Sequence, residues 1–285
     1  MSSAQYNLDL IDLQCFLEWG IDLLKVDDCF STPVKDNAQY SQNTITRWRT
    51  LLPSSIILHN SRYGCMAKTP CKNIYSCPLN KFIPAPVSTY CNQVCDMYRI
   101  SVDIEPAWKY IKDEVLARAG KSAQSFPGSW ADLDSLMPFD QYFSFLEQRS
   151  QFSMWCILSS PLIISADMTT LKEEHFVMYG DENAIAVNQE YYGDSGDLIQ
   201  QFGKISVFRK VLDNRVAILI QNFAKRPTLT YTFSNFHQLT AIFNGPSKAC
   251  RVTNIWKSVN ETITLGQQIL VGPRDCVFLI FNFCE

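Results

Sequence analysis

The sequence of 285 residues has no apolar run that approaches the roughly 20 residues a helix needs to cross a bilayer. Its first residues, 1–7, lack the basic-then-apolar pattern of a signal peptide. Basic residues are not in excess, because 25 Lys and Arg stand against 28 Asp and Glu and the formal net charge is −3. We therefore expect no membrane-spanning segment and no nucleic-acid or anionic-membrane partner, and small neutral substrates are favoured.

Paired CxxC motifs are also absent, although the chain has eleven cysteines. Zinc knuckles pair their ligands closely, so zinc is the weaker interpretation, and disulfides in an oxidising compartment are favoured. The sequon Asn260-Glu261-Thr262 agrees with secretion, and we expect a secreted, lysosomal or vacuolar protein without a bound metal. Five of the cysteines fall in one loop-like stretch at intervals of six, six, fourteen and four residues, namely Cys65, Cys71, Cys77, Cys91 and Cys95.

The stretch Trp19–Cys29 (WGIDLLKVDDC) joins an apolar run to a cluster of acids. The run Ile21–Val26 predicts a short strand buried on both faces, and Asp27 and Asp28 follow it directly. Because the C-terminal ends of parallel strands face the cleft of an α/β sheet or barrel, a carboxylate there is well placed for chemistry. Lys25 lies on the same face two residues before Asp27 and would keep it ionised. The alternative is that Asp27 or Asp28 only caps a following helix.

The first two thirds of the chain alternate helical and strand patterns. Gly20 and Pro53 end the first two predicted helices. Asp103 stands near the end of a predicted strand that contains Arg99, and Asp167 ends a later one. Successive parallel strands with acids at their C-terminal ends predict the later part of a (β/α)8 barrel. The predicted helices cover 8–19, 45–52, 106–116 and 145–155, and the predicted strands cover 21–26, 55–60, 97–104, 125–134 and 159–168.

The last third of the chain changes character near Tyr191. Short β-branched and aromatic segments are separated by Gly, Pro, Asn and Asp, with no helical stretch between them. This pattern predicts an antiparallel β-sandwich. We therefore expect a barrel domain over 1–190 and a β-sandwich domain over 191–285. The predicted strands of the sandwich are KISVFRKV, RVAILIQNF, TLTYTF, LTAIFN and CVFLIFNF.

Five motifs in this order resemble the melibiase family of retaining α-galactosidases and α-N-acetylgalactosaminidases. They are WGIDLLKVDDC, YRISVDI, GSWADLD, SSPLIISADM and ENAIAVNQE, and the likeness covers nearly the whole chain. The resemblance implies a (β/α)8 TIM barrel followed by a C-terminal antiparallel β-sandwich. It also implies an enzyme that removes terminal α-linked galactose or N-acetylgalactosamine from oligosaccharides or glycoconjugates, without a cofactor.

The resemblance further implies a role for individual residues. Asp27 would be the nucleophile that forms a covalent glycosyl-enzyme, and Asp103 would be the acid and base. The carboxyl groups of a retaining pair stand about 5 to 5.5 Å apart. The structural alternative for Arg99 is a buried ion pair with an acid such as Asp132. The positions expected to contact or support the sugar are Lys25, Arg99, Cys29, Ser61 and Asp132, with Asp134 beside them.

Three other residues receive structural roles from the same comparison. His59 is one of three histidines and is expected to pack or hydrogen-bond structurally, because the family needs no histidine for its chemistry. Trp130 could line the sugar site or fill the core, and the core is favoured. Cys95 matches a family cysteine whose usual partner is replaced here, and we expect it to pair with one of the cysteines at 65, 71 or 77.

This chain departs from the family pattern in three places. In the family two further barrel strands with an adjacent aspartate pair precede this region, so the barrel looks partial, and a second copy of the chain could cover its open edge as a homodimer. The family's disulfide partner of Cys29 lies in that region, so Cys29 is expected to be free. Where the family has Glu-Trp or Ser-Trp, this chain has Ser61 and Arg62. Ser61 leaves room for an N-acetyl group, but Arg62 fits neither subgroup.

Two other hypotheses stay open beside the hydrolase. A non-catalytic carbohydrate-binding homologue would keep its sugar affinity in an Asp27→Asn variant and would not be labelled by an activated fluorosugar. A metal-dependent barrel enzyme would use Asp27, Asp28 and Asp167 as oxygen ligands of a magnesium ion. Activity that is unchanged in a chelator would exclude the metal enzyme.

Overall fold

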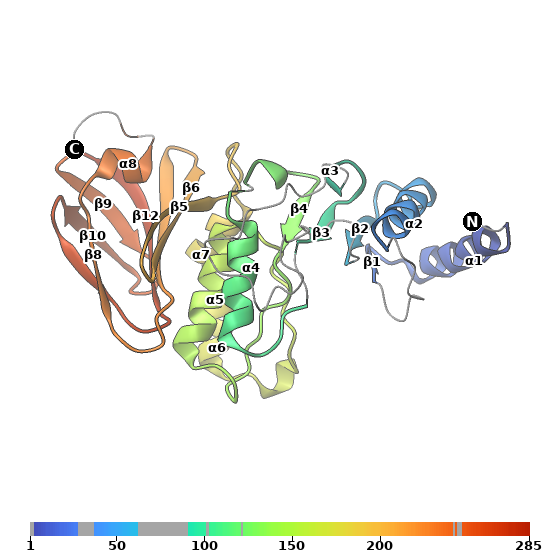
Figure 1. Cartoon of the computed structure of the whole chain (residues 1–285), viewed down its shortest axis with the longest axis horizontal. Coiled ribbons are helices and arrows are strands. Elements are labelled where there is room, and N and C mark those ends of the chain that lie inside the picture. The colour runs from blue at the N-terminus through green and yellow to red at the C-terminus, as the bar shows by residue number, and fades with distance from the viewer. Residues whose placement is uncertain are drawn as a thin grey trace. The chain divides into compact units, whose positions relative to one another are not determined.

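The computed structural model describes residues 3–27, 37–61, 91–100, 103–120, 122–241, 243 and 247–285 (Figure 1). The chain divides into two compact units. Unit 1 comprises Met1–Val102 and Pro127–Asp132, and unit 2 comprises Asp103–Phe126 and Leu133–Glu285. The predicted domain boundary at residue 190 stays a prediction, because this division follows contacts and places residues on both sides of 190 in unit 2.

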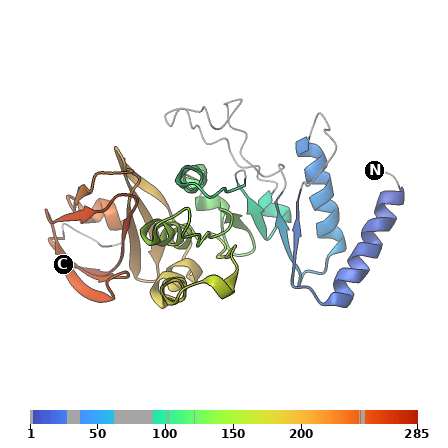
Figure 2. The ribbon, with the colours of Figure 1, turned by 90° about the horizontal axis from the view of Figure 1, so that it is seen from below.

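Unit 1 is built on a parallel sheet with strand order β1-β2-β3-β4 (Figure 2). The predicted alternation of helix and strand is confirmed here, and Gly20 ends the first helix with a φ of +67°, a conformation that glycine adopts without strain. The strands are β1 (Leu23–Val26), β2 (Ile57–Asn60), β3 (Met97–Arg99) and β4 (Trp130–Asp132), and the helices are α1 (Ser3–Trp19), α2 (Asn37–Leu51) and α3 (Cys91–Val94).

The prediction that the first strand is buried on both faces is wrong. In β1 Leu23 is 37% exposed, Lys25 is exposed, and Leu24 and Val26 are only half-buried. β1 is exposed because it lies at the edge of the sheet and pairs only with β2 among the described strands. The neighbouring strand β2 is the more buried of the two, and its Leu58 is fully enclosed.

The first part of unit 2 consists of helices that pack around α5 (Phe145–Ile157). Ser144 and Glu147 form a reciprocal capping box at its start, and Phe152 and Trp155 are buried as predicted. The predicted strand 159–168 is wrong, because only Ile164 bridges to Leu136 there and the rest is irregular. The other helices are α4 (Trp108–Arg118), η4 (Ser122–Gln124), η5 (Met168–Thr170), α6 (Glu173–Tyr179) and α7 (Glu182–Gln189).

The rest of unit 2 is the predicted antiparallel β structure, with a six-stranded sheet of order β10-β9-β12-β7-β6-β5 and a two-stranded sheet of β11 and β8 (Figure 1). Its core is apolar and includes the contacting rings of Phe233, Phe236 and Phe281. The strands are β5 (Asp197–Phe202), β6 (Ile205–Leu212), β7 (Arg215–Asn222), β8 (Leu229–Thr232), β9 (Ala249–Asn254), β10 (Val259–Thr264), β11 (Gln268–Val271) and β12 (Cys276–Cys284).

Two features of this region bear on the predictions. The first two residues of the predicted strand LTAIFN, Leu239 and Thr240, belong instead to the helix α8 (Phe236–Thr240), where the Asn235 side chain accepts a hydrogen bond from the Gln238 amide. The predicted disulfide chemistry is confirmed by the bond between Cys250 and Cys284, which are opposite each other in β9 and β12.

Candidate functional site

One face of the unit 1 sheet collects the polar side chains that the sequence marks. In a strand, residues two apart face the same side, and register partners in adjacent strands share that side. Lys25 pairs with His59, and Arg99 pairs with Asp132. His59 in turn pairs with Met97, which lies two residues before Arg99, so all four polar residues face one side of the sheet.

The same face continues past the ends of two strands. The Ser61 amide donates to the Val26 carbonyl at 2.9 Å, which extends the ladder between β1 and β2 by one step. Ser61 lies two residues after His59 and Asp27 two residues after Lys25, so the alternation places both on the polar face. Ser61 is buried and Asp27 is exposed. Five predicted site residues therefore share this face at the C-terminal end of the strands, namely Lys25, Asp27, Ser61, Arg99 and Asp132.

A buried pair holds this face together. His59 Nε2 on β2 lies 2.8 Å from Asp132 Oδ2 on β4, although β3 stands between these strands in the sheet. Both side chains are almost fully enclosed, with 1% and 4% of their surface exposed. Arg99, on the intervening strand, is 1% exposed. A histidine, an arginine and a carboxylate are therefore enclosed together on this face of the sheet.

His59 is the residue that the sequence analysis underrated. Its structural role is confirmed, but its partner is a predicted site residue rather than a core group. Two features of the sequence could have indicated that His59 belongs to the site. His59 lies near the end of its predicted strand, as Lys25 does in the preceding one, and Asp132 lies near the end of a later predicted strand, so all three could face the same side of a parallel sheet.

Asp103 belongs to unit 2 and is exposed. The next residue, Ile104, donates its amide to Asp134 Oδ2 at 2.8 Å. Asp134 has a φ of +74°, and its carbonyl oxygen accepts from Trp155 Nε1 at 2.7 Å. This buried tryptophan and the left-handed turn fix Asp134, which in turn fixes the backbone beside Asp103. The expected separation of Asp27 from Asp103 stays a prediction.

Several other predicted residues receive different roles or fall outside the described residues. Asp167 does not end a strand, because Oδ1 of its carboxylate accepts from the Thr169 amide at 2.9 Å and caps η5. The expected disulfide of Cys95 is wrong, since Cys95 is a buried free thiol, whereas Cys91 is disulfide-bonded. Burial raises the pKa of the Cys95 thiol to about 12. The residues outside the described ranges are Asp28, Cys29 and Arg62.

Among the described residues no group of three His, Cys, Asp or Glu side chains is arranged to hold a metal ion. None of the helices in the same ranges is both long and apolar enough to cross a bilayer. Asp27 lies in unit 1 and Asp167 in unit 2, and the metal-enzyme hypothesis stays untested.

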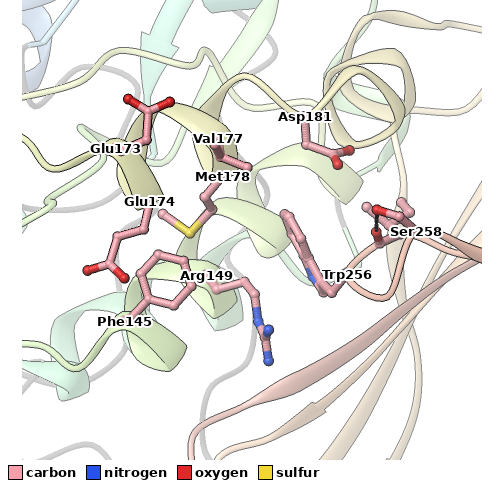
Figure 3. A pocket seen from close by; sticks show the side chains of 10 residues that line it. Phe145, Arg149, Glu173, Glu174, Val177, Met178, Asp181, Trp256 and Ser258 are labelled. Carbon is pink, nitrogen blue, oxygen red and sulfur yellow. Dashed lines mark hydrogen bonds between the residues drawn. The ribbon is translucent and has the colours of Figure 1, made fainter.

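Unit 2 contains a separate cavity of about 490 Å³ (Figure 3). It lies among α5, α6, the start of α7 and the turn between β9 and β10, and none of the predicted site residues lines it. Its wall is half aromatic or aliphatic and half polar. The lining residues are Phe145, Arg149, Glu173, Glu174, Val177, Met178, Asp181, Ile255, Trp256 and Ser258.

Curated proteins similar to this chain are glycosidases by name. Human α-galactosidase A is 29% identical over 213 residues, which cover 71% of this chain and 44% of that protein. Mouse α-N-acetylgalactosaminidase is 26% identical over 238 residues, which cover 78% of this chain and 51% of that protein. The chain therefore spans about half the length of these relatives.

Solved structures of similar fold confirm the fold class. α-Galactosidase I from Mortierella vinacea aligns with a TM-score of 0.78 at 18% identity, covering 95% of this chain and 70% of its own. The α-galactosidase of Saccharomyces cerevisiae with raffinose aligns with a TM-score of 0.72 at 14% identity, covering 96% and 74%. The predicted partial (β/α)8 barrel with a C-terminal antiparallel β-sandwich is thus confirmed.

The family model described as "Alpha galactosidase A" (Melibiase_2) matches residues 2–190. This range contains every residue of the polar sheet face and also Asp103. With this match over more than half of its length, the chain belongs to the Melibiase_2 family.

Proposed function

We propose that the protein is a retaining glycoside hydrolase that removes terminal α-linked galactose or N-acetylgalactosamine from oligosaccharides or glycoconjugates. The observation that carries the proposal is the polar face of the unit 1 sheet, where Lys25, Asp27, Arg99 and Asp132 gather at the C-terminal end of parallel strands in a member of this family. That edge of a parallel barrel sheet is where active sites are built.

Asp27 is the proposed nucleophile. Its carboxylate attacks the anomeric carbon, the bond from that carbon to the leaving oxygen breaks, and a covalent glycosyl-enzyme forms. Asp103 is the proposed acid and base, which gives its proton to the leaving oxygen and then takes one from the water that releases the sugar. Both residues are exposed, so a substrate can reach their carboxyl groups.

The neighbouring side chains are proposed to bind the sugar. Lys25 and Arg99 donate hydrogen bonds to its hydroxyl groups, and their positive charges favour the ionised form of Asp27. Asp132 accepts a hydrogen bond from the sugar or supports Arg99, and His59 fixes its carboxylate. Ser61 is the proposed selectivity position, and Cys29 is proposed to border the sugar.

The proposal is tested by kinetics with aryl α-galactosides and aryl α-N-acetylgalactosaminides. The Asp27→Asn variant should lose at least about 10³-fold in kcat, because the amide cannot form the glycosyl-enzyme. Asp22→Asn is the matched control, since Asp22 is an exposed aspartate at the opposite end of β1. It should keep the activity of the unchanged protein.

Three outcomes of this test have different meanings. Equal kcat in the Asp27→Asn variant and the control would contradict the proposal. No turnover in any variant, with sugar binding that survives Asp27→Asn, would favour the non-catalytic carbohydrate-binding homologue. The ratio of kcat/KM for the two aryl glycosides would define the substrate preference, and the small Ser61 side chain leads us to expect turnover of the N-acetylated sugar.

We further propose a secreted, lysosomal or vacuolar location. The Cys250–Cys284 disulfide suits an oxidising compartment, and Asn260 of the sequon is exposed on β10, an edge strand of the six-stranded sheet. A homodimer stays a prediction.

A further inference from the structure

The unit 2 cavity has walls that are held in place before any ligand binds. Trp256 donates from Nε1 to Ser153 Oγ at 3.0 Å and contacts the rings of Phe152 and Phe278. Arg149 is tied to Asp275 by an ion pair of 2.7 Å. Because both side chains already have partners, the wall they form needs little reorganisation to receive a ligand.

The cavity combines an apolar floor with a rim of hydrogen-bond acceptors. Figure 3 shows Met178 between Phe145 and Glu174 on one side and Trp256, Asp181 and Ser258 on the other. Met178 and Ile255 are buried, whereas Glu173 and Glu174 are exposed at the first turn of α6. A ligand that suits this cavity has an apolar surface and several hydrogen-bond donors at its edge.

Charge narrows the choice of ligand. Three carboxylates line the cavity, those of Glu173, Glu174 and Asp181, and they repel anions. A cation at the aromatic wall would meet the positive charge of Arg149, which lines the cavity with its guanidinium carbon 5.8 Å from the centroid of the Trp256 ring. A neutral ligand with many hydroxyl groups meets both conditions.

We infer that this cavity is a binding site for a neutral saccharide, distinct from the residues proposed for catalysis. The apolar face of a pyranose ring would pack against Trp256 and Met178, while its hydroxyl groups donate to the carboxylates of Glu174 and Asp181. Asp181 Oδ1 already accepts from the Ala184 amide at 2.9 Å, which fixes its side chain for this purpose. The site goes beyond the proposed hydrolysis, because unit 2 would hold a second sugar unit, either from the same oligosaccharide as the substrate or from another one.

The test uses hydrogen–deuterium exchange of the Asp27→Asn protein, which cannot hydrolyse the probe, with raffinose as the neutral probe and trigalacturonate as its anionic counterpart. Raffinose should slow exchange in the segments that contain 173–181 and 254–258, and trigalacturonate should not. The Val177→Trp variant should abolish this protection and weaken raffinose binding there at least about tenfold, because Val177 lines the cavity and is 66% exposed, so a larger side chain can fill it from the solvent side.

The matched control is Phe176→Trp, which changes a neighbouring exposed residue that does not line the cavity and should leave the protection unchanged. Absence of raffinose protection, equal protection in the Val177→Trp variant, or equal protection by trigalacturonate would each overturn the inference. The measurement needs no turnover and reads segments of unit 2 alone. A failure of the Asp27 chemistry would therefore leave its result unaffected.

Discussion

His59 and Asp132 form a buried pair that reaches over a strand, and this pair decides how the polar face of unit 1 is held. Their 2.8 Å contact is enclosed from solvent, where a charged group without a partner is costly. The sequence predicted that each residue would be structural or supporting, but it could not predict their contact, because the two strands are separated by β3 in the sheet.

The two members of this pair should be coupled in their effect on stability. We expect Asp132→Ala to lower the free energy of unfolding by about 3 kcal/mol, because His59 is left buried without its carboxylate partner. The double variant with His59→Ala should lose less than the sum of the single losses. Urea unfolding of the four proteins of this cycle measures the coupling. Additive losses would show that the contact contributes nothing to stability.

At the scale of elements, Lys210 connects the sandwich strand β6 to the end of helix α7. Its Nζ donates to the carbonyl oxygens of Val187 at 2.6 Å and Asn188 at 3.0 Å. These groups belong to the last turn of α7, where carbonyls lack partners within the helix and a cation is favourable. Burial nevertheless lowers the pKa of Lys210 to about 8, against the opposing charges of Asp194, Cys156 and Glu190.

This pKa predicts that the contribution of Lys210 to stability rises with pH. Between about pH 8 and 10.5 the unfolded chain keeps the Lys210 proton while the folded protein releases it, so this contribution to the free energy of unfolding increases through the window. The full shift corresponds to about 3 kcal/mol. Below pH 8 both states are protonated and the cost of the buried charge is constant.

Thermal melts across this window should separate Lys210 from the other groups that titrate there. The stability difference between the unchanged protein and Lys210→Met should grow from pH 8 to 10.5 in favour of the unchanged protein, whereas the difference from Lys257→Met, which changes an exposed lysine, should stay constant. Parallel pH profiles for the unchanged protein and Lys210→Met would contradict the assignment.

Gly196 marks a second contact between a barrel helix and the sandwich. It precedes β5 with a φ of +79°, and a Cβ atom added there would lie 1.8 Å from the carbonyl oxygen of Ile157, the last residue of α5. Only glycine can occupy this position without moving a backbone.

We expect Gly196→Ala to cost about 2 to 4 kcal/mol, from the left-handed backbone and the overlap with Ile157 together. Gly193→Ala separates the two causes, because Gly193 has a φ of +71° and open space where the Cβ would lie. That control should cost only about 1 to 2 kcal/mol. Chemical unfolding measures the loss of unfolding free energy in both variants. Equal losses would show that the backbone near Ile157 moves away from the added Cβ atom without destabilising the protein.

Helices and strands were predicted correctly where neighbouring residues in the sequence determine them. They were missed where contacts with residues far along the chain determine them. Gly20 and Pro53 ended helices as predicted, since backbone preference acts locally. The strands β5, β9, β10 and β11 were not among the predicted segments. Of these, the edge strands β5 and β10 carry polar residues such as Gln200 and Asn260 and lack a continuous apolar pattern. The predicted strand LTAIFN overlaps the last two residues of α8, Leu239 and Thr240, because its sequence is aromatic and β-branched, whereas the start of α8 depends on the Asn235 cap.

At the scale of the whole molecule, the order of motifs was enough to predict the fold class and the family. It was not enough to predict whether all the residues of the proposed site come together. The family motif fixed Lys25, Asp27, Arg99 and Asp132 by sequence spacing, and the parallel register then placed them on one face. The role of Asp103 could not be derived from the same register, since it belongs to unit 2. The chain spans about half the length of its curated relatives, covering 44% of one and 51% of another.

The account depends on Asp27 acting as a nucleophile, and covalent trapping tests this most directly. The protein is incubated with an activated fluorosugar of the galactose series and digested, and the peptides are analysed by mass spectrometry. We predict one glycosylated peptide, with the sugar ester-linked to Asp27, and no label in the Asp27→Asn variant. An ester on another carboxylate, or turnover of aryl α-galactosides by a protein that never becomes labelled, would contradict the account.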